Sequence, residues 1–140
     1  MKEKILVSAC LLGVDCKYSG GNNYNEKVLE YIKDKEVIPV CPEILGGLST
    51  PRPPSERIDS KVINNQSIDV TKEYTKGAEQ ALLLTKLFNV KKALLKAKSP
   101  SCGKGKIYDG TFSGVLIEGN GVTTELLELN GITVITEQDL

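Results

Sequence analysis

The chain contains no histidine. This absence removes imidazole, which is the commonest general base of enzymes, the usual partner of a nucleophilic serine or cysteine, and a frequent ligand of catalytic zinc. Most hydrolase triads and most catalytic zinc sites are therefore excluded. Any proton transfer falls to cysteine, a carboxylate, lysine, tyrosine, serine or water.

The sequence also lacks net charge and long apolar runs. Its 18 basic residues equal its 18 acidic residues, so no net basic field attracts a nucleic-acid backbone. No stretch approaches the roughly 20 apolar residues of a membrane span, and the N-terminal apolar run is too short for a signal peptide. We therefore expect a cytoplasmic protein whose usual partner is neither a membrane nor a nucleic acid. The 140 residues, 40% of them hydrophobic, fit one domain over residues 1–140.

The four cysteines are the residues of this sequence that say most about its function. Because the cytoplasm keeps thiols reduced, we expect them to be ligands, nucleophiles or core residues rather than disulfide partners. They are Cys10, Cys16, Cys41 and Cys102.

Short apolar runs alternate with helical patterns along the chain. Strands are predicted at 5–9, 37–41, 90–96 and 132–135, and helices at 26–33, 71–88 and 123–129. Asn25 is the predicted N-cap of the first helix, and an apolar stripe that includes Phe88 marks the longest one. Residues 42–60 are predicted to form a long loop, and residues 61–70 a hairpin that turns at residues 64–65.

This alternation predicts an α/β fold. We expect a single compact domain with a mostly parallel, Rossmann-like sheet, helices on its faces, and long cysteine-bearing loops at the carboxyl ends of the strands. Cys10 directly follows the first strand, Cys41 ends the second, and Cys102 lies beyond the strand that follows the long helix. If these strands are parallel, the three thiols emerge at the carboxyl edge of the sheet, where open α/β folds bind ligands.

The cysteines admit four interpretations. Core cysteines would pack within helices or strands. Cys10, Cys41 and Cys102 instead each stand at a loop that is rich in glycine, proline or serine. A structural zinc site usually takes thiolates from a local C-x-x-C pair, and the sequence contains none. A nucleophilic cysteine lacks its usual imidazole. An iron–sulfur cluster is favoured, because its ligation requires thiolates and tolerates wide spacing, while the other three interpretations stay open.

Three motifs carry a family resemblance, and together they extend over essentially the whole chain. They are SACLLG with CKYSG (8–13 and 16–20), CPEILGGL with PRPPSE (41–48 and 51–56), and KSPSCG with YDGTFSG (98–103 and 108–114). In this order they resemble the 2-thiouracil desulfurase family of small bacterial proteins. The resemblance implies removal of sulfur from a thiolated pyrimidine, which gives the oxo base and sulfide. It also implies a [4Fe-4S] cluster held by only three cysteines.

By this resemblance the cluster ligands are Cys10, Cys41 and Cys102, the same three that stand at strand ends. Three thiolates leave one iron open, and this iron accepts and polarises the thiocarbonyl sulfur while water adds at carbon. The desulfuration is non-redox, because sulfide leaves without net electron transfer. Cys16 is interpreted as a packing neighbour of the cluster, with a fourth ligand and a sulfur acceptor as the alternatives.

Without histidine, Glu43 is the preferred group for catalytic proton transfer, because it follows Cys41 by two residues. An ordinary exposed carboxylate is the alternative interpretation of this residue. Ser101 is assigned to the surroundings of the cluster and Ser99 to the substrate. For both serines, simple turn formation is the alternative.

Other residues of the three motifs are candidates for supporting roles. Arg52 and Glu56 are expected to pair with each other and so to fix their loop. Lysines near the third motif can offset an anionic cluster or bind a substrate phosphate, and tyrosines in the motif loops can stack on a base. These residues are Lys98, Lys104 and Lys106, and Tyr18, Tyr24 and Tyr108.

The predicted function is thus iron–sulfur-dependent desulfuration of 2-thiouracil or a related thio-base or nucleotide, a small-molecule substrate. Two alternatives come from other classes of protein: a non-catalytic iron–sulfur redox or iron sensor, and a small zinc-stabilised interaction module. Thiolated RNA stays an alternative substrate. The sequence does not determine the oligomeric state.

Overall fold

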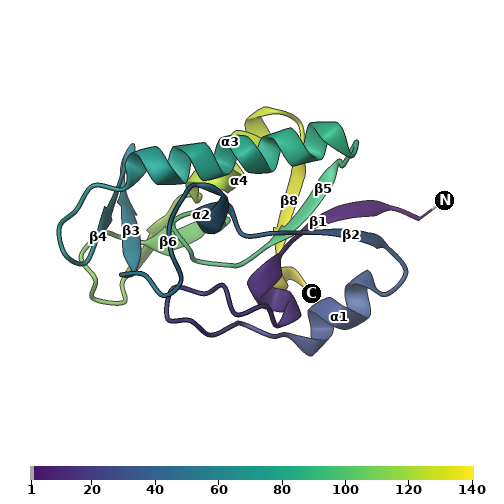
Figure 1. The fold of residues 1–140 in the computed structure, drawn as a ribbon, viewed down its shortest axis with the longest axis horizontal. Helices are drawn as coiled ribbons and strands as arrows, with labels where there is room; N and C mark the ends of the chain where they lie inside the picture. Colours follow the sequence, from purple (N-terminus) through teal and green to yellow (C-terminus); the bar gives the residue numbers. More distant parts are fainter. Residues whose placement is uncertain (1) are drawn as a thin grey trace.

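A four-stranded parallel sheet forms the centre of the computed structural model, which describes residues 2–140 (Figure 1). Its strands, in spatial order, are β2 (Glu36–Val40), β1 (Lys4–Ser8), β5 (Lys92–Leu95) and β8 (Thr133–Thr136). Every neighbouring pair in this order is parallel. The predicted α/β fold and its four strands are confirmed, with strand ends shifted by one or two residues.

Apolar side chains on both faces of the sheet explain why these runs form strands. Ile5 and Val7 belong to the core cluster that includes residues of α1 (Glu26–Ile32), whereas Leu6 belongs to the cluster on the opposite face. All three side chains are fully buried. Near-continuous apolar strands are typical of a parallel sheet that is covered on both faces.

Two helices, α3 (Thr71–Leu87) and α4 (Val122–Leu129), cover the face opposite to α1 (Figure 1). Ala81 of α3 and Leu127 of α4 are fully buried and pack in the same core cluster as Leu6. The sheet therefore lies between two helical layers, and its carboxyl edge is left to the loops.

The start of α1 is where the sequence predicted it, whereas the end of α3 is not. Asn25 caps α1 as predicted, because its side-chain oxygen accepts hydrogen bonds from the backbone N–H groups of Lys27 and Val28, at 2.9 and 3.3 Å. The prediction that Phe88 continues the apolar stripe of α3 is wrong. The helix ends one residue earlier, and the side chain of Phe88 is 43% exposed.

A short helix, α2 (Pro42–Leu45), follows β2 where the sequence predicted only a loop. Cys41 occupies its N-cap position, and Pro42 stands in the first turn, where the missing N–H of proline leaves no hydrogen bond unmade. α2 packs closely on α3 through two glycines. A Cβ atom at Gly46 would lie 1.9 Å from a backbone oxygen of α3, and one at Gly77 would lie 2.0 Å from the backbone oxygen of Pro42. This close contact places Cys41 relative to the longest helix.

Two small antiparallel hairpins lie beyond the carboxyl edge of the sheet (Figure 1). One pairs β3 (Ser55–Ile58) with β4 (Lys61–Asn64), and the other pairs β6 (Lys106–Tyr108) with β7 (Leu116–Glu118). The predicted hairpin over 61–70 is confirmed in part, because after β4 the chain turns at residues 64–67 and a single antiparallel bridge joins Ile63 to Asp69. The longer pairing lies before β4, where the last part of the predicted loop forms β3.

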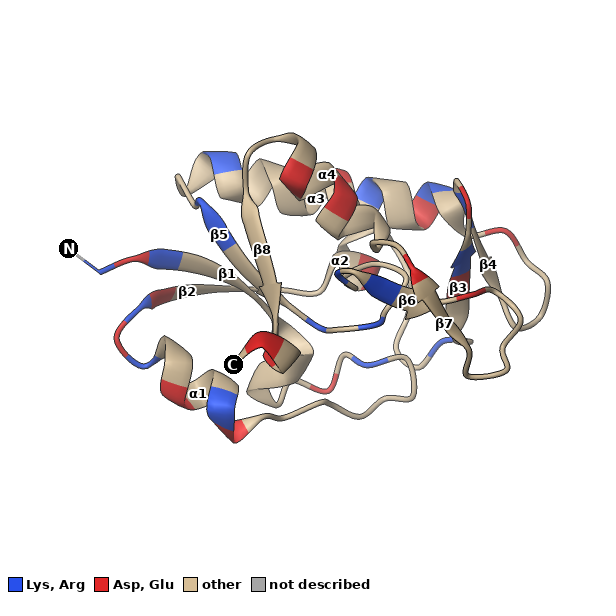
Figure 2. Cartoon of the chain, turned by 180° about the vertical axis from the view of Figure 1, so that it is seen from behind, with Lys and Arg blue, Asp and Glu red and all other residues tan. Residues whose placement is uncertain are grey.

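Basic and acidic residues are interspersed over the molecule. Figure 2 shows both signs of charge on α1, on α3 and on β3. This distribution agrees with the equal numbers of basic and acidic residues in the sequence. Over residues 2–140, none of the helices has both the length and the apolar composition that a membrane span requires.

Candidate active site

A cavity of about 500 Å³ opens beyond the carboxyl ends of β1, β2 and β5, and all four cysteines line it. Ser8, Val40 and Lys96, at the ends of these strands, form part of its wall. The volume falls in the range of small-molecule sites, roughly 300–1,000 Å³. The structure thus brings together thiols that lie far apart in the sequence.

The parallel sheet explains this convergence. Cys10 lies in the 3-10 helix η1 (Ala9–Leu12), directly after β1, and Cys41 follows β2 as the N-cap of α2. Cys102 lies in the loop after β5. Because parallel strands end at the same edge, each of these segments enters the cavity from the same side of the sheet.

Cys16 lies close to Cys10 and Cys41, and the thiol of Cys41 donates to the backbone oxygen of Cys16 at 3.8 Å. Contact with Cys16 lowers the pKa of Cys10 and the pKa of Cys41, and the same contacts raise the pKa of Cys16. Of these three thiols, Cys16 therefore holds its proton most strongly. The lowered pKa values suit Cys10 and Cys41 to ligation, because a metal ligand is the thiolate.

Cys102 is held in a buried network of hydroxyl groups. Burial raises the pKa of its thiol to about 12. Ser101 Oγ lies 3.7 Å from the sulfur of Cys102 and 2.9 Å from Thr123 Oγ1. The backbone N–H of Cys102 donates to Ser99 Oγ at 2.7 Å. Ser99 lines the cavity, whereas Ser101 is buried behind it beside the sulfur.

These donors fit an iron–sulfur cluster better than a single metal ion. Within residues 2–140, no three side chains of His, Cys, Asp or Glu are close enough together to hold one ion. The thiols of Cys10, Cys41 and Cys102 instead surround a common cavity, and soft thiolates are the ligands that iron–sulfur clusters take. This arrangement also differs from the compact four-ligand set of a structural zinc site.

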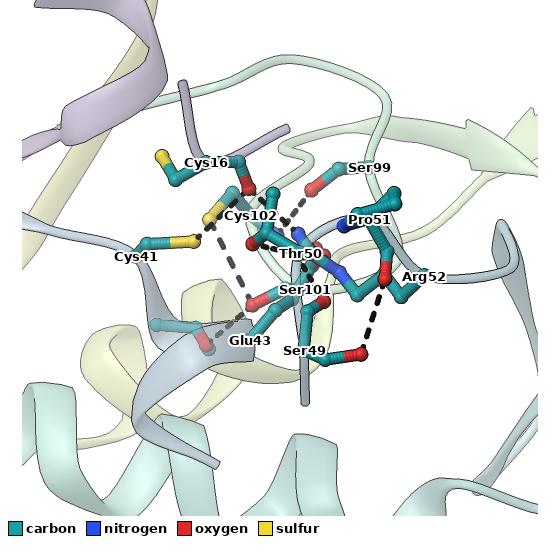
Figure 3. A network of polar contacts seen from close by, with 11 residues as sticks. Cys16, Cys41, Glu43, Ser49, Thr50, Pro51, Arg52, Ser99, Ser101 and Cys102 are labelled. Atoms are coloured by element: carbon teal, nitrogen blue, oxygen red, sulfur yellow. Dashed lines mark hydrogen bonds and ion pairs between the residues drawn. The ribbon is translucent and has the colours of Figure 1, made fainter. Parts of the chain in front are cut away.

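Glu43 lines the cavity and is bound by Arg52 (Figure 3). Arg52 Nε and Nη2 both donate to Glu43 Oε2, at 2.9 and 2.5 Å. Nη2 also donates to the backbone oxygen of Cys16 at 3.0 Å, and Nη1 donates to Ser49 O and Thr50 Oγ1, both at 3.2 Å. Arg52 therefore finds an acceptor for each of its five N–H bonds, while Glu43 Oε1 is left unbound by this guanidinium.

The expected pair of Arg52 and Glu56 does not form. Arg52 precedes β3 and reaches the carboxylate of Glu43, whereas Glu56 lies on β3 and faces the β6–β7 loop. Glu56 Oε1 accepts the backbone N–H groups of Gly110 and Phe112, at 2.9 and 3.0 Å. The two residues of the PRPPSE motif thus fix two different segments of the cavity wall.

The structure separates the candidate lysines and tyrosines by their place in the fold. The candidates that line the cavity are Lys98, Tyr18 and Tyr108. Those outside its lining are Lys104, Lys106 and Tyr24. Lys104 is directed away from the cysteines, because it pairs with Glu128 on α4.

Sequence reasoning missed several residues that line the cavity, among them Lys17, Lys96 and Phe112. Lys96 forms an ion pair of 3.0 Å with Glu137, the first residue of the 3-10 helix η2 (Glu137–Asp139). Phe112 stands in the YDGTFSG motif, so its position in a motif was a usable signal. Lys17 likewise stands in the CKYSG motif, whereas Lys96 had no such signal, since lysines are common at exposed strand ends.

Known proteins are similar to this chain over nearly its whole length. A family model described as 2-thiouracil desulfurase matches residues 5–139. The uncharacterized protein YbbK of Bacillus subtilis (strain 168) is 43% identical over 146 residues, which covers 97% of each chain. The solved structure of a [4Fe-4S]-dependent thiouracil desulfidase, TudS, is similar with a TM-score of 0.94 and 46% identity. This similarity covers 99% of the present chain and 93% of that one.

Proposed function

The chain belongs to the 2-thiouracil desulfurase family, and from this premise we propose that Cys10, Cys41 and Cys102 hold the cluster of a [4Fe-4S]-dependent thiouracil desulfurase. The enzyme releases sulfur from thiouracil, and the site residues named here carry out that reaction. Neither a sensor nor a zinc module finds support in the matched relatives, since the solved structure is that of a desulfidase.

The meeting of the cysteines in one cavity carries this proposal. Cys10 and Cys41 have environments that favour the thiolate, and the sulfur of Cys102 faces the same space. Contacts with Cys10 and Cys41 raise the pKa of Cys16, so its proposed role is that of a protonated neighbour of the ligands. When bound, a cluster with one iron free of protein ligands supplies a Lewis-acidic position for the thiocarbonyl sulfur.

Glu43 is the proton-transfer group of the proposed reaction. Arg52 holds its Oε2, so Oε1 is the oxygen available to a water molecule in the cavity. Glu43 takes a proton from this water as the oxygen adds to the thiocarbonyl carbon, and it returns the proton as the C–S bond breaks. Thiouracil and water thus give uracil and hydrogen sulfide, with no oxidant or reductant consumed.

Ser99 is the proposed partner of the pyrimidine ring. Its oxygen accepts the backbone N–H of Cys102 at 2.7 Å, so its own proton is free to donate to a carbonyl oxygen of the base. Ser101 has a different proposed role, since it is buried beside the Cys102 sulfur and supports the ligand instead of the substrate.

Turnover by the anaerobically reconstituted protein tests the proposal. Wild-type protein with a full complement of iron and sulfide is incubated with 2-thiouracil and, separately, with 4-thiouracil. We expect uracil and sulfide in equal amounts, quantified by chromatography and by a colorimetric sulfide assay. Uracil itself and cluster-free protein serve as controls. Loaded protein that releases no sulfide from either thiopyrimidine would contradict the proposed function.

A further inference from the structure

Phe112 adopts a backbone conformation that its side chain disfavours. Its φ is 57°, which lies in the left-handed region. This conformation is unfavourable for a bulky residue, because the side chain crowds against its own backbone. Such conformations persist only where the surrounding contacts enforce them, and they concentrate at functional sites. Phe112 lines the cavity that the cysteines share, so a residue with a strained backbone forms part of the cavity wall.

Glu56 supplies the contacts that enforce this conformation. Its Oε1 accepts the backbone N–H groups of Gly110 and Phe112 at 2.9 and 3.0 Å, and the residue is only 8% exposed. The loop is also pressed onto β3 at Gly110, where a Cβ atom would lie 2.3 Å from Ile58 Cγ1. The loop between β6 and β7 is therefore fastened to β3 at the point where Phe112 faces the cavity.

We propose that Phe112 determines specificity for a pyrimidine by stacking on the substrate ring, and that Glu56 is the residue that positions it. This inference rests on the proposed function and adds to it a determinant of substrate binding. A pyrimidine is planar and aromatic, and a phenyl face offers it an offset stack. Because the phenyl ring has no polar group, it binds the face of the base and leaves the polar edge to groups such as Ser99.

The other aromatic residues at the cavity are less suited to this role. Tyr18, Tyr74 and Tyr108 also line the cavity. Tyr74 belongs to α3 and is only 3% exposed, so little of its ring is open to a ligand. The ammonium of Lys17 lies 5.7 Å from the ring centroid of Tyr18, so one face of that ring already has a partner. Tyr108 belongs to β6, where its backbone is set by strand pairing. Phe112 alone among these four aromatic residues has a backbone held by a buried carboxylate.

Steady-state kinetics of the loaded enzyme provide the first test. Phe112→Leu keeps an apolar side chain but removes the flat face, so we expect KM for thiouracil to rise about 5- to 100-fold, the range for loss of one base–aromatic stack. We expect kcat to change much less and the iron content not at all. Phe112→Tyr retains the face and should keep KM within about twofold. An unchanged KM in Phe112→Leu would overturn the inference.

A fluorescence measurement tests the same contact without turnover. The sequence contains no tryptophan, so Phe112→Trp introduces a single reporter. Uracil, the product, should quench or shift its emission in the loaded enzyme. Val115→Trp is the matched control, because Val115 lies in the same loop, is 50% exposed and does not line the cavity. Equal responses of the two reporters to uracil would contradict stacking at residue 112.

The role of Glu56 is tested through its acceptor oxygen. Glu56→Gln keeps an oxygen that can accept both N–H groups, and it should retain the wild-type KM. Glu56→Ala should raise KM as Phe112→Leu does, and the two changes together should raise it no further. Additive effects would show that Glu56 does not act through Phe112. If the wild-type enzyme turns over while Phe112→Leu and Glu56→Ala keep its KM, only this inference fails. If the loaded wild type does not turn over, the proposed function fails instead.

Discussion

Arg52 donates two hydrogen bonds to one carboxylate oxygen of Glu43, which leaves the other oxygen unbound by the guanidinium. The same guanidinium binds the backbone oxygen of Cys16 (Figure 3). Arg52 therefore joins the loop that follows β1 to the helix that follows β2, and it orients the proposed proton-transfer group. Although burial opposes the charged form, the Glu43 carboxylate raises the pKa of Arg52.

Glu43→Gln should remove most of the turnover and leave the cluster in place. The amide keeps the shape of the side chain but cannot exchange a proton, and general acid–base groups contribute about 10²- to 10⁴-fold to a rate. We therefore expect kcat to fall about 100-fold or more, with iron content and visible absorption equal to those of the wild type. Wild-type kcat in this variant would rule out proton transfer by Glu43.

Arg52→Gln should lower kcat through its effect on Glu43. We expect a decrease of about 10- to 100-fold in the wild-type background and almost none in the Glu43→Gln background, because interacting residues are not additive. Removing one partner of a buried ion pair destabilises a protein by about 3–5 kcal/mol, so urea unfolding is measured on the same variants. A decrease in kcat of equal size in both backgrounds would show that Arg52 acts independently of Glu43.

We expect alanine variants of three of the four cysteines to lose the cluster and the variant of the fourth to keep it. Replacement of Cys10, Cys41 or Cys102 by alanine should each abolish cluster retention, because each removes one proposed ligand. Cys16→Ala should retain most of the iron and sulfide, since Cys16 is the protonated neighbour. Iron and sulfide content and visible absorption after anaerobic reconstitution measure the difference. Equal loss of the cluster in Cys16→Ala would contradict the assignment of the three ligands.

Gly77→Ala should destabilise the fold although alanine favours helices. Alanine gains about 1 kcal/mol over glycine in a helix, but its Cβ would lie 2.0 Å from the backbone oxygen of Pro42. Overpacking of this kind typically costs about 1–3 kcal/mol, so we expect a lower urea midpoint and, because α2 must move, weaker cluster retention. Lys76→Ala, at an exposed position of the same helix, is the control and should change stability by less than about 0.5 kcal/mol. A midpoint of Gly77→Ala at or above that of wild type would contradict the close packing of α2 on α3.

The sequence was informative wherever a property follows from local pattern. The apolar run at Ile5 to Val7 predicts a strand buried on both sides, and Asn25 predicts the start of α1, because burial and capping depend on a few neighbouring residues. The same patterns were insufficient at α2. Four residues that include proline and glutamate carry no helical periodicity, and this helix exists because two glycines let it pack on α3.

By itself, the sequence predicted a mostly parallel sheet and, for parallel strands, the emergence of three thiols at its carboxyl edge, because the alternation of strands with helices favours parallel strand directions. Only the tertiary structure decided which side chains meet within the cavity. Arg52 and Glu56 lie four residues apart in one motif, yet one binds Glu43 and the other binds the loop of Phe112. The reason is physical: a side-chain contact between distant loops depends on how the elements that carry them pack, and no local pattern in the chain encodes that packing.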